Sequence, residues 1–206
     1  MSENIFFKIS DLKACGNNVI IGQTVRIRYP ELVEIGDNVI IDDFCYISSS
    51  LKLSSNVHIS SGCKIIGGKQ SHVSFESFST LAPNVVLAAG SDDYTSGIAT
   101  PLVPHKYKGD YEVGTIRIGK HCIVGSNSTI LPNVRLHNGA CLGANSLAKI
   151  DLEKWSLYAG VPAEKIKSRD RVTILNLEKE YYESKNELWF YYADAAAVWF
   201  WRKNCH

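Results

Sequence analysis

An aliphatic residue recurs at every sixth position through much of the chain, and the position four residues after each is small to medium and apolar. A strand alternates with a period of about two and a helix with about 3.6, so a six-residue period predicts a short strand and a corner, repeated. Three such sides close one coil, and stacked coils place each aliphatic residue on the one eighteen positions away. The first run contains Ile35, Ile41, Ile47, Leu53, Ile59 and Ile65.

Two interruptions divide this repeat. After Ile65 the segment G-G-K-Q-S-H-V-S shifts the register, which recovers at Phe75, and a polar segment from Asp92 to Thr115 then precedes a second run. The second run contains Ile118, Val124, Ile130, Leu136 and Leu142. We therefore expect an N-terminal segment at 1–34 with an initial irregular coil, a domain of parallel β-coils at 35–167 with a protruding loop at 92–115, and a C-terminal helix at 168–206.

The tail after Pro162 lacks the repeat, and an apolar stripe predicts a helix from Ser168 to Lys203. Its last part, L-W-F-Y-Y-A-D-A-A-A-V-W-F-W-R-K, is apolar nearly all round but shorter than the span of about twenty residues that a bilayer needs. Its Trp and Tyr content suits peripheral contact with a membrane interface. Burial against the β-coil or a neighbouring subunit is the other interpretation.

Composition narrows the class of protein. The 206 residues are enough for one domain with an appendage. A net charge of +1 gives no electrostatic support for nucleic-acid binding. The segment from Met1 to Lys13 lacks the basic-then-apolar order of a secretory signal, so we expect a cytoplasmic protein, at the inner face of the membrane if the tail binds lipid.

The cysteines follow the scaffold rather than a disulfide or metal pattern. Cys45, Cys63 and Cys122 all fall at the position of the repeat that takes a small apolar side chain. Stacking of Cys45 on Cys63 gives poor disulfide geometry, so we expect free thiols. No C-x-x-C pair is present, and we expect no metal.

Several motifs together resemble a known superfamily. These are the six-residue repeats, the exposed loop with His105, the stretch T-I-R-I-G-K-H-C-I-V-G-S-N-S-T-I-L-P-N-V-R-L and the ending L-Y-A-G-V-P-A-E-K-I. They resemble hexapeptide-repeat acyltransferases of the galactoside and maltose acetyltransferase type, over roughly residues 35–169. The stretches S-D-D-Y and W-S-L-Y-A-G-V-P are similar to acetyltransferases of bacterial surface-polysaccharide synthesis. The resemblance implies an all-β, left-handed parallel β-helix, a homotrimer, and acetyl-CoA bound as co-substrate in a groove between adjacent coils.

The loop is where a reactive group can stand, because the packed core has no room for one. Acetyl transfer to a hydroxyl needs a base, and His105 suits that role if its second ring nitrogen is held by a carbonyl or carboxylate. Asp92 and Asp93 could orient His105 or bind sugar hydroxyls, and turn capping explains them equally well. Asn84 matches an asparagine that lines the acceptor pocket in the family, although a left-handed corner also explains it. If His105 is not the base, Asp92, Asp93 or the substrate would handle the proton.

The resemblance also assigns residues to the cofactor. Ser126 and Ala144 fall where family members present backbone groups to the pantetheine arm. Lys149 lies near a family lysine, and Lys165, Lys167 and Arg169 suit pairing with the 3'-phosphate and the diphosphate, with a solvated basic face as the alternative. Ile123 stands where the family often has a tryptophan.

The resulting hypothesis is an acetyl-CoA-dependent O-acetyltransferase that acts on a saccharide, a bacterial surface polysaccharide or its precursor, with His105 as general base. The alternative is N-acetylation of a nucleotide-linked amino sugar, because an amine is the better nucleophile and needs less help from a base.

Overall fold

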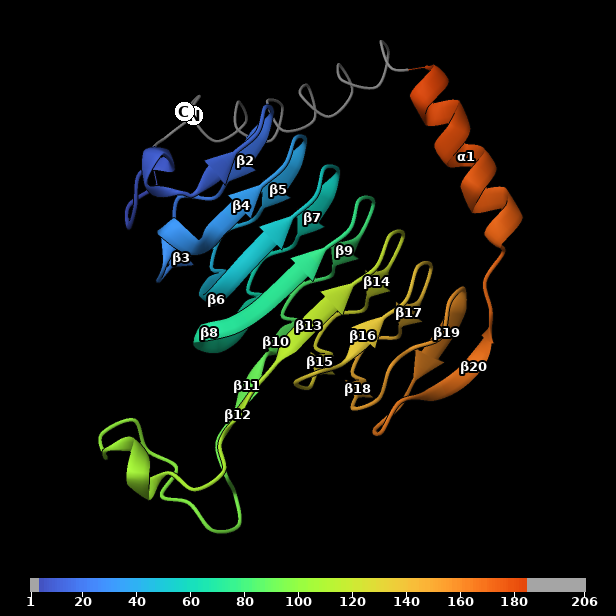
Figure 1. Ribbon diagram of the computed structural model, residues 1–206. Coiled ribbons are helices and arrows are strands. Elements are labelled where there is room, and N and C mark those ends of the chain that lie inside the picture. Colours follow the sequence, from blue (N-terminus) through green and yellow to red (C-terminus); the bar gives the residue numbers. More distant parts are fainter. Residues whose placement is uncertain (1–3, 185–206) are drawn as a thin grey trace, which may run out of the picture. The chain divides into compact units, whose positions relative to one another are not determined.

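The backbone winds into coils whose three sides are short parallel strands. The computed structural model describes residues 4–184, and Figure 1 shows the strands of successive coils stacked side by side. The pairing register repeats every eighteen residues in the regular part, where Ile41 lies beside Ile59. The result is a left-handed parallel β-helix of about seven coils followed by a helix, which confirms the predicted fold class.

Each coil contributes to three faces, which we call face 1, face 2 and face 3. Face 1 contains β1 (Ala14–Cys15), β4 (Val33–Ile35), the end of β6 (Tyr46–Leu53), the end of β8 (Lys64–Phe75), β13 (Thr115–Ile118) and β16 (Arg135–Leu136). Face 2 contains β2 (Val19–Ile21), β5 (Val39–Ile41), β7 (Val57–Ile59), β9 (Thr80–Leu81), β14 (Ile123–Val124), β17 (Cys141–Leu142) and β19 (Ser156–Ala159). Face 3 contains β3 (Arg26–Ile27), the beginnings of β6 and β8, β10 (Val86–Ala88), β15 (Thr129–Ile130) and β18 (Leu147–Ala148).

The remaining elements lie outside this regular winding. They are β11 (Gly90–Ser91), β12 (Glu112–Val113), β20 (Glu164–Ser168), α1 (Arg171–Glu183) and the short 3-10 helices η1 (Ile9–Asp11), η2 (Pro30–Leu32) and η3 (His105–Tyr107). Strand β20 runs antiparallel to β19, so it closes the end of face 2 rather than continuing the coil.

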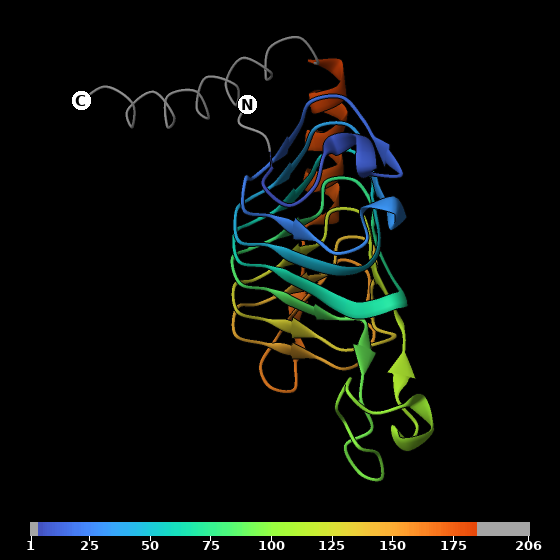
Figure 2. The same cartoon turned by 90° about the vertical axis from the view of Figure 1, so that its left-hand side faces the viewer.

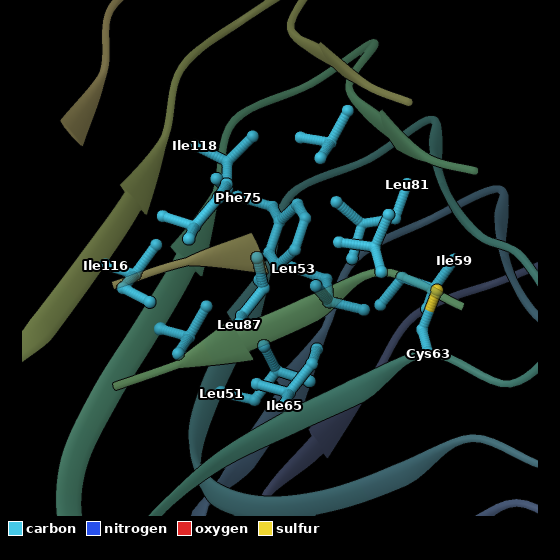
Figure 3. Packing of buried hydrophobic residues seen from close by; sticks show 14 of the residues in the cluster. Leu51, Leu53, Ile59, Cys63, Ile65, Phe75, Leu81, Leu87, Ile116 and Ile118 are labelled. Atoms are coloured by element: carbon cyan, nitrogen blue, oxygen red, sulfur yellow. The ribbon is translucent and has the colours of Figure 1, made fainter. Parts of the chain in front are cut away.

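The core is the ladder that the six-residue period predicts. Both runs of aliphatic residues are buried, with exposed fractions of 3% or less, and Figure 3 shows how residues from successive coils pack together. Cys45, Cys63 and Cys122 fill the small apolar position and are buried free thiols, as expected. Burial raises the pKa of the Cys122 thiol to about 12, which keeps it protonated and unreactive.

The corners are turned by residues in the left-handed backbone conformation, which asparagine tolerates better than most residues. Asn18, Asn38 and Asn56 have φ values of 57°, 55° and 60° on successive coils. Their side-chain amides also pair across the coils, at 3.1 Å between Asn18 and Asn38 and 3.4 Å between Asn38 and Asn56. These asparagines therefore have a structural explanation.

The coils begin earlier than predicted, and an insertion in β8 changes their period. Parallel pairing already begins at Ala14, where β1 pairs with β4, so the ladder starts within the segment predicted as irregular. In β8 the residues between Ile65 and Phe75 outnumber those between their partners Ile47 and Leu53 in β6. This insertion widens one corner without breaking the sheet on either side of it.

The tail belongs to a second unit that starts at Asp170. The Asp170 side chain caps α1 by accepting hydrogen bonds from the backbone N–H and hydroxyl of Thr173 at 3.0 and 2.7 Å. Among residues 4–184, no helix is both long and apolar enough to cross a bilayer. The aromatic segment on which the membrane and burial interpretations rest lies outside the described residues.

We predict that Ile65→Ala lowers the free energy of unfolding by about 2–5 kcal/mol, because Ile65 is fully buried between Ile47 and Leu87 and its truncation leaves a cavity. The matched control is Lys64→Ala, on the exposed side of the same strand, with a change within about 0.5 kcal/mol. Urea unfolding at one protein concentration measures both. Equal losses for the two variants would contradict the ladder as the source of stability.

Candidate active site

The polar segment leaves the β-helix on a two-stranded stalk at the corner between face 3 and face 1. Strands β11 and β12 pair antiparallel, with Gly90 opposite Val113, and the rest of the loop projects away from the coils (Figures 1 and 2). The Asn133 side chain anchors the return strand, since it accepts from the Thr115 N–H at 3.0 Å and donates to the Glu112 carboxylate at 2.6 Å. The base of the loop is thus fixed to the next coil.

Asp93 organises the beginning of this loop. One carboxylate oxygen accepts from the N–H and hydroxyl of Thr95 at 2.8 and 2.9 Å, and from the Ser96 N–H at 3.1 Å. The other accepts from the Ser96 hydroxyl at 2.6 Å and the Asp110 N–H at 3.2 Å. These hydrogen bonds, that of the Ser96 hydroxyl first, hold the pKa of Asp93 well below its ordinary value. The carboxylate is therefore ionised and joins the two ends of the loop.

Asp92 has a different partner. Its carboxylate lies 3.2 Å from the ammonium of Lys108, whose side chain is only 15% exposed. The same ammonium lies 5.9 Å from the centre of the Tyr111 ring. Sequence reasoning missed Lys108 and Tyr111, because their only signal is that they fall inside the interruption. Asp92 and Lys108 together make a charged pair at the foot of the loop.

His105 stands in η3 on the far part of the loop and is exposed. Its ring lies against that of Tyr111, with the ring centres 5.3 Å apart. Within residues 4–184, neither ring nitrogen has a hydrogen-bond partner. The carbonyl or carboxylate that would fix the tautomer of a catalytic histidine is thus absent from the described part of this chain.

The predicted cofactor residues Ser126 and Ala144 lie on one corner of adjacent coils, between face 2 and face 3. The Ser126 carbonyl accepts from the Asn145 N–H at 2.8 Å, which joins the two coils. The N–H groups of Ser126 and Ala144 themselves make no hydrogen bond within the described residues. Two unpaired donors on successive rungs can bind the carbonyl groups of an extended ligand along the corner.

Asn84 lies on the same corner, one coil earlier. Its φ is 61°, and its N–H donates to the Ser61 carbonyl at 3.0 Å. A Cβ at Gly62 would come within 2.3 Å of the Asn84 side-chain oxygen, so the amide packs on the preceding coil. The corner explanation accounts for Asn84 without a ligand, since the register places it in one column with Asn127 and Asn145, which have the same left-handed conformation.

The loop and this corner are not brought together within one chain. The corner with Asn84, Ser126 and Ala144 precedes face 3, whereas the loop leaves at the corner that follows face 3. Strands β10, β15 and β18 separate them. Asp92, Asp93 and His105 therefore lie on the loop, whereas the predicted acceptor residue Asn84 lies on the corner with Ser126 and Ala144, and we call these two groups the candidate half-sites.

The predicted basic residues are also divided. Lys149 is exposed beside β18, Lys165 pairs with Glu153 at 2.6 Å, and Lys167 is exposed on β20. The Glu153 carboxylate raises the pKa of Lys165.

Arg169 has a structural role. Its guanidinium donates to the backbone carbonyls of His121 and Gly139 at 2.8 and 2.7 Å, so it clamps two coils near the opposite corner. No group of three His, Cys, Asp or Glu side chains suited to a metal ion occurs among residues 4–184.

Comparisons with known proteins agree with this architecture. The family model described as bacterial transferase hexapeptide (six repeats) matches residues 115–147, which contain Ser126 and end three residues after Ala144. A dTDP-4-amino-4,6-dideoxy-D-glucose acyltransferase of Escherichia coli is 34% identical over 181 residues, or 85% of this chain and 92% of that relative.

Solved structures of another acyltransferase show the same likeness in three dimensions. The crystal structure of AntD, an N-acyltransferase from Bacillus cereus in complex with dTDP and 3-hydroxybutyryl-CoA, matches with a TM-score of 0.82 and 33% identity, over 89% of this chain and 100% of AntD. An AntD variant bound to dTDP-4-amino-4,6-dideoxyglucose and coenzyme A matches with a TM-score of 0.81.

A more distant relative is named for acyl transfer to oxygen instead of nitrogen. WbbJ of Escherichia coli strain K12, named for lipopolysaccharide O-acetyl transfer, is 27% identical over 130 residues, or 63% of each chain. Together, the near-complete match to the dTDP-sugar acyltransferase and the coils of the fold show that this chain is an enzyme and belongs to the bacterial hexapeptide-repeat acyltransferases.

Proposed function

We propose that this acyltransferase moves an acyl group from acyl-coenzyme A to the amino group of a nucleotide-linked amino sugar. The observation that carries the proposal is the likeness over nearly the full length of AntD, whose crystal structures hold acyl-CoA, dTDP and the amino sugar nucleotide. The geometry of the loop favours the same acceptor, because within residues 4–184 His105 has no partner of the kind that orients a base for a hydroxyl.

In the proposed site, coenzyme A lies along the corner of Ser126 and Ala144. Their N–H groups, which have no partner within residues 4–184, would donate to the carbonyl groups of the pantetheine arm, and Ala144 is exposed while Ser126 is partly exposed. The loop that carries Asp92 and His105 would come from a second subunit of a homotrimer. This arrangement unites the two half-sites that one chain keeps apart, and it places the thioester between them.

The reaction needs little from the protein beyond alignment and charge. The neutral amine attacks the thioester carbonyl, a C–N bond forms, the C–S bond breaks, and the leaving thiolate takes up a proton released from nitrogen. Holding the two reactants in line supplies most of the rate enhancement in such a site. The Asp92 carboxylate would accept a hydrogen bond from the amine, and the ion pair with Lys108 would hold that carboxylate in place.

O-acetylation of a surface polysaccharide or its precursor is the second candidate. It is favoured by the exposed imidazole of His105 at the loop and by the likeness to WbbJ. In this case His105 would accept the hydroxyl proton, and a group outside the described residues would have to hold its second nitrogen.

We predict that the enzyme acylates dTDP-4-amino-4,6-dideoxyglucose at least about a hundredfold faster than the matched nucleotide sugar with a hydroxyl in place of the amine. Product mass gives the acyl transfer, and treatment with hydroxylamine distinguishes the products, since it cleaves esters and leaves amides intact. A hydroxylamine-labile product, or faster reaction of the hydroxyl compound, would refute N-acylation.

The His105→Ala variant should lose less than about tenfold in kcat with the amino acceptor, because the amine needs little base catalysis. Steady-state kinetics at pH 7 measures the change, and the melting temperature confirms that the loop substitution leaves the fold intact. A loss of about a hundredfold or more would instead identify His105 as the general base and favour the hydroxyl acceptor.

The Asp93→Ala variant should open the loop, because it removes all five hydrogen bonds of the carboxylate. We expect tryptic cleavage within residues 92–111 to accelerate about tenfold while the melting temperature stays the same. The matched variant Asp92→Ala removes one ion pair at the same place and should change cleavage less. Equal cleavage of the two variants would contradict the organising role of Asp93.

A further inference from the structure

Two arginines stand side by side on the outer surface of face 1. Strands β13 and β16 pair in parallel with Arg117 directly beside Arg135, and both side chains are exposed. Neighbouring strands lie about 4.8 Å apart, and residues in register point to the same side of the sheet. The two guanidinium groups therefore share one patch of surface.

Neither guanidinium is neutralised by the part of the chain that the structure describes. Arg117 and Arg135 have no ion pair and no side-chain hydrogen bond within residues 4–184. In the N-terminal coils of the same face, by contrast, the charged side chains form ion pairs. There, the Glu34 carboxylate contacts the ammonium groups of Lys13 and Lys52 at 2.5 and 3.8 Å. Among the described residues, charge on face 1 is thus paired in the N-terminal coils and unpaired at Arg117 and Arg135, near the loop.

The carboxylates nearest in sequence have other partners. Asp151 accepts from the Arg135 backbone N–H at 2.8 Å, and its second oxygen lies 3.8 Å from the ring of His137. Glu112 is hydrogen-bonded by the Asn133 amide at 2.6 Å. Neither Asp151 nor Glu112 therefore neutralises the two guanidinium groups, which can bind an anionic ligand.

Like charges directly opposite each other destabilise a sheet. Two adjacent arginines without a carboxylate partner therefore lower the stability of the fold, which calls for an explanation. The charge of Arg117 acts on a neighbouring side chain. Burial, and after it the charge of Arg117, lowers the pKa of His72 on the preceding rung. A bound anion would remove this repulsion.

The pair lies at the foot of the loop at 92–115. Arg117 is two residues after Thr115, where the loop returns to the β-helix. Arg135 is two residues after Asn133, whose side chain holds that return. A ligand on the arginines would therefore lie beside the stalk formed by β11 and β12.

We propose that Arg117 and Arg135 form a binding site for a diphosphate ester. The planar guanidinium group binds phosphoryl oxygens in a bidentate manner, and two of them on adjacent rungs can each contact one phosphoryl group. Both co-substrates of the proposed function, coenzyme A and a nucleotide-linked sugar, carry a diphosphate. The inference rests on that function for the identity of the ligand but not for the existence of the site.

The test is direct binding of coenzyme A and of dTDP, each titrated by calorimetry at one salt concentration. The variants Arg117→Gln and Arg135→Gln keep the length of the side chain and remove its charge. We expect each to raise the Kd of one of the two ligands about ten- to hundredfold and to leave the other unchanged, which identifies the source of the diphosphate. Arg26→Gln, on the outer surface of face 3, is the matched control and should change neither Kd.

Stability provides a second readout, because a merely structural role would move it in the opposite direction. Without ligand, Arg135→Gln should raise the melting temperature by about 1–3 °C, since it relieves the repulsion. Unchanged Kd values for both ligands would overturn the proposal. This holds even if sedimentation shows that the variants alter subunit association, because the arginines would then serve an interface between subunits and not a ligand. If the arginine variants lose ligand binding but the unaltered enzyme does not acylate the amino sugar, the binding site stands and only the proposed function is refuted.

Discussion

The parallel pairing of each coil with the next is the constraint on which the rest of this structure depends. Because each strand pairs in parallel with its counterpart in the next coil, eighteen residues away in the regular part, a side chain at one position of the repeat lies on its equivalent in that coil. The interior therefore consists of stacked aliphatic residues, and on the surface polar residues and backbone groups of successive coils are stacked in the same way. The asparagine corner, the donors at Ser126 and Ala144, and the pair of Arg117 and Arg135 all arise from this one geometric rule.

The same rule limits where chemistry can occur. A packed column leaves no interior room for reactants, so polar groups must stand on corners, on outer faces or on a loop that leaves the coils. In this chain a loop leaves the coils on a short antiparallel stalk, and Asp93 ties the two ends of that loop together. The loop and the Ser126 corner lie on either side of face 3, which is why the proposed site needs two copies of the chain.

How far the sequence predicts the structure depends on whether a residue belongs to the repeat. Residues such as Ile65 and Cys63 could be placed in the core from spacing alone, because one period determines both strand and corner. The structure begins the coils earlier, at Ala14, where the aliphatic spacing is less regular. Within the loop, the partners of Asp93 and the contact of Asp92 with Lys108 depend on irregular backbone that no period describes.

Arg169 shows a second limit. Its position after the repeat suggested a phosphate ligand, but the guanidinium binds two carbonyl groups of the coils. Conversely, Arg117 and Arg135 look like ordinary outward residues of the repeat until the register places them side by side. Charges on a solenoid gain their meaning from the neighbouring coil, which is eighteen positions away and out of reach of local patterns.

A crystal structure of the enzyme with coenzyme A and dTDP-4-amino-4,6-dideoxyglucose tests the central claim most directly. Our account predicts coenzyme A along the corner of Ser126 and Ala144, with its sulfur facing the amino group of the sugar and the loop of a second subunit closing the site. Coenzyme A bound away from this corner, or a sugar whose hydroxyl rather than its amine faces the sulfur, would contradict it.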